Sequence, residues 1–192
     1  TNGDALFRDE NGNLTNDFNQ SRYIYPASPE PKFIGGFNTS LAWNGFNLGA
    51  FFEFKGGNYV MLIERRYLES DGAQMSNNQL LTALNYWKKL GDTGVNPKPL
   101  AGNATQSNNF GTTRFLQRGD YLRVKDITLS YSFNREQLEQ FKVGGMKLYL
   151  SAQNIYTFHD VDWWDPERGV DGIGYGIYPM TKALVGGIEL SF

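Results

Sequence analysis

The stretch FNTSLAWNGFNLGAFFEF, residues Phe37–Phe54, decides the fold. Apolar residues alternate with small or polar ones on both sides of Asn44-Gly45. Successive side chains of a β-strand point to opposite faces, so this alternation predicts two strands that each have one apolar face. Asn-Gly favours a two-residue type I′ turn, which needs positive φ at both central positions. The stretch therefore predicts an antiparallel hairpin.

Further along the chain, three more stretches alternate in the same way. They cover residues 121–133, 146–158 and 183–192. The four connections between the five predicted strands are in turn short, long, short and long. They are the Asn-Gly turn and residues 55–111, 134–145 and 158–180. This regular change of length places every short connection at one end of the sheet and every long one at the other.

The connections carry little regular structure of their own. The pattern of leucines predicts a short helix over 78–90 in the first long connection. A second helical segment is predicted after Asn134, whose side chain suits a helix N-cap. Residues 1–36 are predicted to be an irregular segment leading into the first strand, because they are rich in turn formers and prolines.

The composition of the 192-residue chain excludes several classes of protein. The net charge of −2 gives no basic surface for nucleic acid, and the absence of cysteine excludes disulfides and thiolate metal sites. Aromatic residues make up 15% of the chain although the mean hydropathy is −0.47. No signal peptide opens the sequence. The chain is therefore either a soluble β protein or a piece of a larger chain whose targeting signal lies elsewhere.

Two architectures share this alternation: a soluble β-sandwich and a transmembrane β-barrel. The polar faces carry mainly Ser, Thr, Asn and Gln, and aromatic residues gather at strand ends, as in barrels that have a wet interior and aromatic girdles. Five strands cannot close a barrel, and an open edge is excluded in lipid. We therefore predict an all-β fold, an antiparallel transmembrane β-barrel segment of a larger barrel. Its long loops, 55–111 and 158–180, and the irregular segment 1–36 are expected to be extracellular.

In that fold the apolar side chains face lipid. The predicted lipid-facing residues are Leu41, Leu48, Phe52, Ile127, Leu129, Leu148, Leu150 and Ile188.

Four stretches of the chain also resemble a known family. They are PEPKFIGGFN (29–38), RGDYLRVKDITLSYSF (118–133), LYLSAQNIYTF (148–158) with the following Asp165-Pro-Glu167, and YPMTKALVGGIELSF (178–192). In this order they resemble the C-terminal part of SusC/RagA-type TonB-linked outer-membrane transporters, within the TonB-dependent receptor superfamily. Two positions depart from the family pattern: Lys182 stands where Arg is usual and Gly186 where an aromatic residue is common.

The resemblance implies a barrel of about 22 strands, closed by an N-terminal plug domain that is absent from this chain. It implies import of glycans or peptides across the bacterial outer membrane, powered through the TonB complex, with a SusD-like surface lipoprotein as partner. It also implies that the last strand is an assembly signal, carried by Gly187, Leu190 and Phe192, with Val185 departing from the pattern. Outer-membrane lipid and the rest of the same barrel are the remaining expected partners.

Two loops hold candidate binding residues. Trp163, Trp164, Tyr175 and Tyr178 are aromatic residues of the 158–180 loop that could stack on a ligand, or pack the loop, or contact the lipoprotein. Asp9, Asn11 and Asn13 have the spacing of a calcium loop, although Leu14 and Gln20 stand where glycine and glutamate are usual. The other interpretation of that stretch is a turn-rich loop, and no other cofactor is expected.

Catalysis is not expected. His159 is the single histidine, and no nucleophile motif accompanies it. Two other functions remain open at this point: a soluble carbohydrate-binding β-sandwich module, and a passive porin.

Overall fold

The computed structural model describes residues 2–139, 143–162, 165–174 and 176–192. The chain divides into two compact units. One contains Thr1–Ser28, Val60–Gln117 and Gly169–Ile177, and the other contains Pro29–Tyr59, Arg118–Arg168 and Tyr178–Phe192. We call them the loop unit and the sheet unit.

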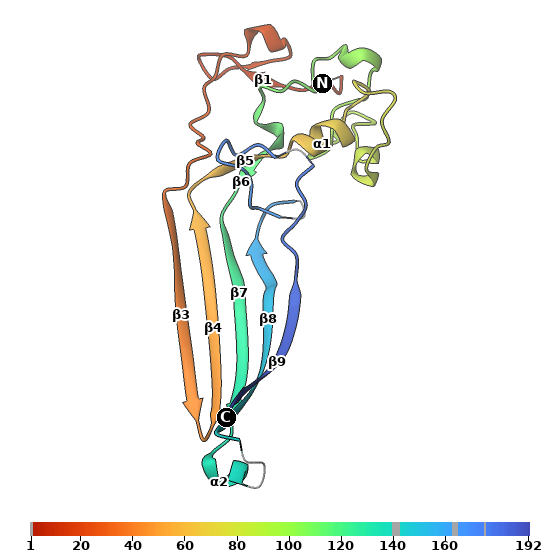
Figure 1. Cartoon of the computed structure of the whole chain (residues 1–192). Helices are drawn as coiled ribbons and strands as arrows, with labels where there is room; N and C mark the ends of the chain where they lie inside the picture. The colour runs from red at the N-terminus through yellow and green to blue at the C-terminus, as the bar shows by residue number, and fades with distance from the viewer. Residues whose placement is uncertain (1, 140–142, 163–164, 175) are drawn as a thin grey trace. The chain divides into compact units, whose positions relative to one another are not determined.

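The sheet unit is built on one antiparallel sheet of five strands in the order β3-β4-β7-β8-β9 (Figure 1). The strands are β3 (Phe33–Trp43), β4 (Phe46–Gly56), β7 (Tyr121–Ser132), β8 (Gly145–His159) and β9 (Ala183–Ser191). The five predicted strands are therefore confirmed. Within the described part of the chain, β3 and β9 each pair on one side only, so the sheet is open at both edges.

The short connections lie together at one end of this sheet, which we call the turn end. Asn44 and Gly45 both have positive φ, 47° and 86°, as the tight turn between β3 and β4 requires. Helix α2 (Arg135–Leu138) follows β7, and Asn134 and Gln137 form a reciprocal capping box at its start. The C terminus lies at the same end (Figure 1). We call the opposite end, where the long connections begin, the loop end.

The strand register gathers the predicted apolar residues on one face. Leu41 faces Leu48, Leu48 faces Leu129, and Leu129 faces Leu150, so these residues form one row across four strands. The other predicted residues lie on the same face in neighbouring rows. They are Phe52, Ile127, Leu148 and Ile188.

One strand is longer than the sequence predicted. β3 begins at Phe33, whereas the expected start was Phe37. The two glycines in between pair with Phe54 and Glu53, respectively, and both lie under aromatic rings of β4. A Cβ built on Gly35 would lie 2.6 Å from the ring of Phe54, and one on Gly36 would lie 3.0 Å from that of Phe51. Cross-strand rings thus cover the bare backbone, a known way to keep glycine inside a sheet.

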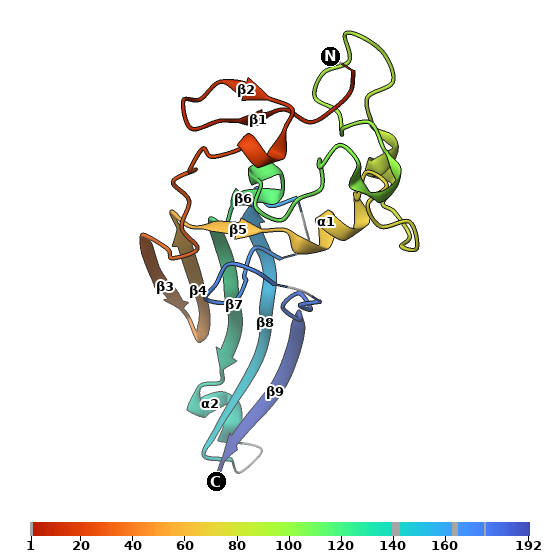
Figure 2. The same cartoon turned by 90° about the horizontal axis from the view of Figure 1, so that it is seen from above.

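The loop unit consists of short helical and extended elements joined by irregular segments (Figure 2). β1 (Phe7–Arg8) and β2 (Leu14–Thr15) form a small antiparallel hairpin, and β5 (Tyr59–Met61) pairs with β6 (Leu116–Arg118). The helical elements are α1 (Ile63–Leu68) and the 3-10 turns η1 (Phe18–Gln20), η2 (Leu81–Leu84), η3 (Ala101–Asn103) and η4 (Thr113–Phe115). The buried apolar residues include Phe7, Val60, Leu62, Ile63 and Phe115.

The prediction of a helix over 78–90 is wrong, because the helix of this connection lies elsewhere. That stretch holds only the 3-10 turn η2, and the helix of the long connection is α1 instead. Beyond η2, the backbone N–H of Trp87 donates to the carbonyl of Asn96, and the N–H of Asn96 donates to the carbonyl of Asn85. Pairing with a distant extended segment thus replaces the local helical hydrogen bonds. None of the helices in the described part of the chain has the length and apolar character needed to cross a membrane.

Candidate functional site

The apolar face of the sheet is exposed in its middle and aromatic towards both ends. Large aliphatic side chains lie open on it: Leu41, Leu48, Leu129, Leu148, Leu150 and Ile188. At the turn end, Tyr131 contacts Phe46 and Phe133, with ring centroids 4.6 and 4.8 Å apart. Towards the loop end, Phe37 stacks on Phe52 at 4.7 Å. An aliphatic band between two aromatic borders is the pattern of a lipid-facing barrel surface, and contact with lipid stays a prediction.

The opposite face is polar and its side chains bond to one another. The carboxylate of Asp126 accepts hydrogen bonds from the hydroxyls of Thr128, at 2.7 Å, and Ser151, at 2.6 Å. Ser151 is buried, as is Ser130 on the same face. Buried polar side chains are normally hydrogen-bonded, and on this face they form hydrogen bonds with one another. This face therefore suits the wet or plugged interior of a barrel.

At the loop end of the polar face lies a cluster of charged residues centred on Arg123, whose side chain is completely buried. Its guanidinium donates to Asp165 at 2.7 Å and Glu167 at 2.9 Å, and its Nε donates to Thr157 at 3.0 Å. The guanidinium carbon also lies 5.2 Å from the ring centroid of Tyr121. A charge that far from water needs such partners. The cluster ties the 158–180 loop to β7 and β8.

Beside this cluster, a second set of contacts joins β7 to β4. The hydroxyl of Tyr121 donates to Glu53 at 2.9 Å, and the ammonium of Lys125 lies 3.4 Å from the same carboxylate. Asp165-Pro-Glu167 belongs to the family resemblance, but its pairing with Arg123 was not predicted from the sequence. The available signal is Arg123 itself, a long cation on the polar face of a predicted strand, where it needs a carboxylate partner once it is buried.

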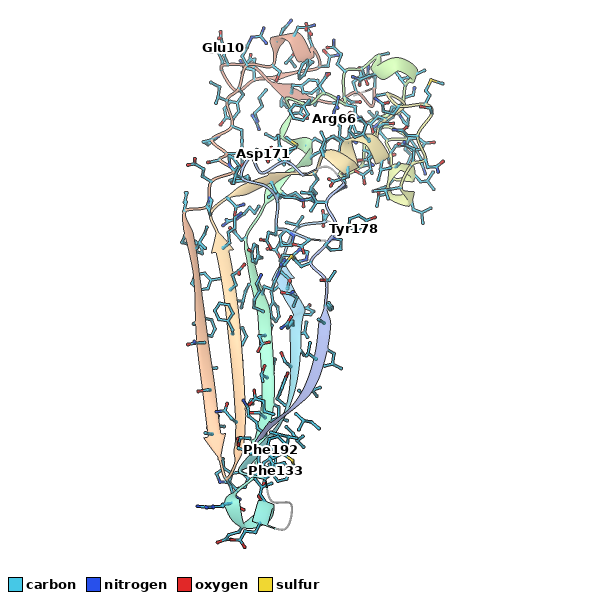
Figure 3. The ribbon with its side chains drawn as sticks, in the orientation of Figure 1. Glu10, Arg66, Phe133, Asp171, Tyr178 and Phe192 are labelled. Atoms are coloured by element: carbon cyan, nitrogen blue, oxygen red, sulfur yellow. The ribbon has the colours of Figure 1, made fainter. Side chains whose placement is uncertain are left out.

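The structure describes only one of the four aromatic residues proposed to bind a ligand. Trp163, Trp164 and Tyr175 lie outside the described residues. Tyr178 is 92% exposed, and Figure 3 labels it near the loop end of the sheet. An aromatic ring open to solvent is available for stacking. Its binding role stays a prediction.

The predicted calcium loop is the turn between β1 and β2. Asp9 Oδ1 accepts hydrogen bonds from the backbone N–H groups of Asn11, at 2.9 Å, and Asn13, at 2.8 Å, and Oδ2 accepts from the side-chain amide of Asn13. Desolvation raises the pKa of Asp9, but the hydrogen bonds together lower it more, so the pKa lies below its ordinary value. The carboxylate therefore already organises the turn, and a cation would compete with the Asn13 amide for it. Calcium binding at this turn stays a prediction.

The predicted assembly signal lies on β9, the last strand of the sheet. Gly187 packs under Tyr149 of β8: a Cβ there would lie 2.5 Å from the ring. Leu190 pairs with Met146, and Phe192 is almost fully exposed beyond the end of the strand. Figure 3 labels Phe192 beside Phe133 at the turn end. Phe192 thus lies at the same end of the sheet as the aromatic residues of the turn end, and its recognition by an assembly machine stays a prediction.

The loop unit contains a groove of about 880 Å³. Its lining includes Trp87, Tyr23 and Arg114. Arg114 is held by the buried carboxylate of Asp71 and donates to Asn96 Oδ1 at 3.1 Å. Because the guanidinium of Arg114 is already paired with Asp71, its main role is to stabilise the loop unit rather than to bind a ligand.

These features define a class of protein. In the described part of the chain, the antiparallel sheet has one apolar face, one polar face and two edge strands that pair on one side only, which is the pattern of a segment of a transmembrane β-barrel.

Comparison with known proteins shows which transmembrane barrels this segment is similar to. No family model matches the chain. It is 26% identical to TonB-dependent receptor P3 of Formosa agariphila over 201 residues, covering 99% of the chain and 19% of that receptor. It is 25% identical to TonB-dependent receptor SusC of Bacteroides thetaiotaomicron, covering 97% of the chain and 17% of SusC. Among solved structures, the RagAB peptide importer in an open-open state matches all of the chain with a TM-score of 0.82 and 27% identity, over 21% of its own chain.

The chain thus spans about a fifth of the length of the curated relatives it matches. Over nearly its whole length the chain is similar in sequence to TonB-dependent receptors, SusC among them, and similar in fold to the RagAB importer, which confirms the resemblance and the fold class predicted from the sequence.

Proposed function

We propose that this chain is the C-terminal part of the barrel wall of a TonB-dependent importer in a bacterial outer membrane. The observation that carries the proposal is the sheet itself. It has an exposed aliphatic band on one face and hydrogen-bonded polar side chains on the other, and in the described residues its two edge strands pair on one side only. Unpaired edges cannot face hydrocarbon, so the remaining strands of the barrel have to cover them.

The role of the segment in import is structural. Its strands separate lipid from the interior, and the segments between the strands at the loop end form part of the extracellular vestibule. We propose glycans or peptides as the substrates. The peptide importer RagAB among the similar structures supports the second class. No residue of the segment is assigned to catalysis.

Two partners follow from the same proposal. A SusD-like surface lipoprotein would cover the extracellular side, since SusC and RagA are among the similar proteins. The TonB complex would supply energy through the N-terminal part of the complete receptor.

The test uses the complete receptor that carries this chain, in cells that lack their own copy. Membranes are separated on a density gradient, and uptake of two labelled probes is measured, a tryptic digest of casein and a mixture of oligosaccharides. The proposal expects the receptor in the outer membrane and uptake of one probe that stops when TonB is deleted. Receptor in the soluble fraction would favour the carbohydrate-binding sandwich. Uptake that continues without TonB would favour the passive porin.

A further inference from the structure

The carboxylate of Asp165 holds together two parts of the chain that are far apart in sequence. Its Oδ1 accepts from the guanidinium of Arg123 at 2.7 Å and from the backbone N–H of Glu167 at 2.9 Å. Its Oδ2 accepts from the backbone N–H of Met180 at 3.0 Å. One side chain thus joins the start and the end of segment 166–179 and fixes both to β7.

A second contact secures the end of the same segment. The side-chain amide of Asn154 donates to the carbonyl of Thr181 at 3.1 Å. Asn154 has a positive φ of 51° within β8, near the point where the pairing of β7 with β8 shifts register. The irregularity in the strand therefore presents an amide that bonds the returning chain.

The residues between these attachments leave the sheet unit and come back. Gly169–Ile177 belongs to the loop unit, whereas Arg168 and Tyr178 belong to the sheet unit. Asp165 and Met180 flank this excursion on both sides. The contact between them therefore closes it at its base.

We infer that Arg123, Asp165 and Glu167 form a clamp that keeps segment 166–179 closed at its base, and that loss of the Asp165 charge opens the segment while the sheet stays folded. The two carboxylates contribute unequally. The side chain of Asp165 is 13% exposed and that of Glu167 is 40% exposed, while Arg123 has no exposure at all. Removal of the more buried partner leaves a buried cation without its main compensation, which is the more disruptive change.

Opening of the segment can be measured at Arg168, which follows the clamp directly. Arg168 is 7% exposed, and Pro166 is buried beside it. Trypsin cleaves after arginine but needs an extended, accessible chain. The rate of cleavage after Arg168 therefore follows the population of the open segment when opening and closing are fast.

The experiment compares four forms of the complete receptor in intact outer membranes: the natural form, Asp165→Asn, Glu167→Gln and Asp160→Asn. Trypsin is added from outside, and mass spectrometry follows the new N terminus at Gly169. Asp165→Asn is expected to be cut at least about tenfold faster than the natural form, and Glu167→Gln about two- to threefold faster. Asp160→Asn, which removes an exposed carboxylate from the same connection, is expected to be cut at the natural rate.

Folding of each variant is checked by the different gel migration of the folded and the heat-denatured barrel. If Asp165→Asn does not fold, the cleavage rate of Glu167→Gln still tests the inference, because that variant keeps the Asp165 carboxylate. Folded variants cut at the natural rate would overturn the inference. So would equal acceleration by Asp160→Asn, which would point to a general effect of charge.

The clamp is inferred from contacts within the sheet unit. Any role of the clamp in import depends on the proposed function. The two fail separately, because cleavage after Arg168 is measured without any transport.

Discussion

Gly186 and Gly187 are neighbours in β9 with opposite steric surroundings. A Cβ on Gly187 would meet the ring of Tyr149 at 2.5 Å, whereas the nearest atoms to a Cβ on Gly186 lie 3.8 Å away. We expect Gly187→Ala to lower the free energy of unfolding by about 1–3 kcal/mol, because the ring has to move. Gly186→Ala is expected to be neutral or slightly stabilising, since glycine is costly inside a strand. Urea unfolding of the complete receptor in detergent measures both.

The same pair has an internal control. If the ring of Tyr149 is the cause, Tyr149→Ala should remove most of the penalty of Gly187→Ala in the double variant. Equal losses at the two glycines would contradict the steric account. Nothing in the structure requires glycine at position 186.

Leu48 and Asn47 test which face of the sheet meets lipid. They are adjacent in β4, both exposed, and point to opposite faces. An arginine facing lipid near mid-bilayer costs roughly 2–4 kcal/mol, whereas one facing the interior can be hydrated. We therefore expect Leu48→Arg to reduce the folded receptor in outer-membrane fractions strongly and Asn47→Arg to have little effect.

The neighbouring pair Leu129→Arg and Ser130→Arg is expected to show the same order but is a less clean comparison. Ser130 is only 7% exposed, so an arginine there also meets steric resistance. If Leu48→Arg and Asn47→Arg were equally tolerated, the lipid-facing assignment would be wrong.

At the scale of a single element, the β1–β2 hairpin should depend on pH through Asp9. Hydrogen bonds from Asn13 and Asn11 favour the ionised carboxylate, so the pKa of Asp9 is lower in the folded hairpin than in the unfolded chain. The stabilisation is therefore complete above the ordinary pKa of 3.8 and is lost as the pH falls through the folded value. Hydrogen exchange of residues 7–15, corrected for intrinsic rates, should show less protection at pH 3 than at pH 5. Asp9→Asn should remove most of that difference.

The elements differ in how well the sequence predicts them. The β3–β4 hairpin and the cap of α2 depend on neighbouring residues, Asn44-Gly45 in one case and Asn134 with Gln137 in the other. Local patterns therefore predict both. The stretch 78–90 has a helical pattern, yet its backbone pairs with Asn96, and such tertiary contacts override local propensity. A pattern of leucines does not contain that information.

At the scale of the whole molecule, the same distinction applies to the site. Alternation of side chains predicts the apolar face, because the register of antiparallel strands preserves it across the sheet. The Arg123 clamp joins residues more than forty positions apart, with sequence separations of 42 for Asp165 and 44 for Glu167. No local period connects such residues. The family resemblance contained both parts of the clamp without showing that they meet.

The segment of residues 1–192, taken alone, exposes apolar surface to water. Its aliphatic band is exposed, and among the described residues β3 and β9 each pair along one side only. Unpaired edges and exposed apolar faces associate in water. We therefore expect residues 1–192 expressed alone to aggregate in detergent-free buffer, whereas the complete receptor remains monodisperse in detergent. Size-exclusion chromatography and analytical ultracentrifugation measure both. A stable, water-soluble monomer of the segment would require its apolar face to be covered within the chain, and it would favour the soluble sandwich over the barrel wall.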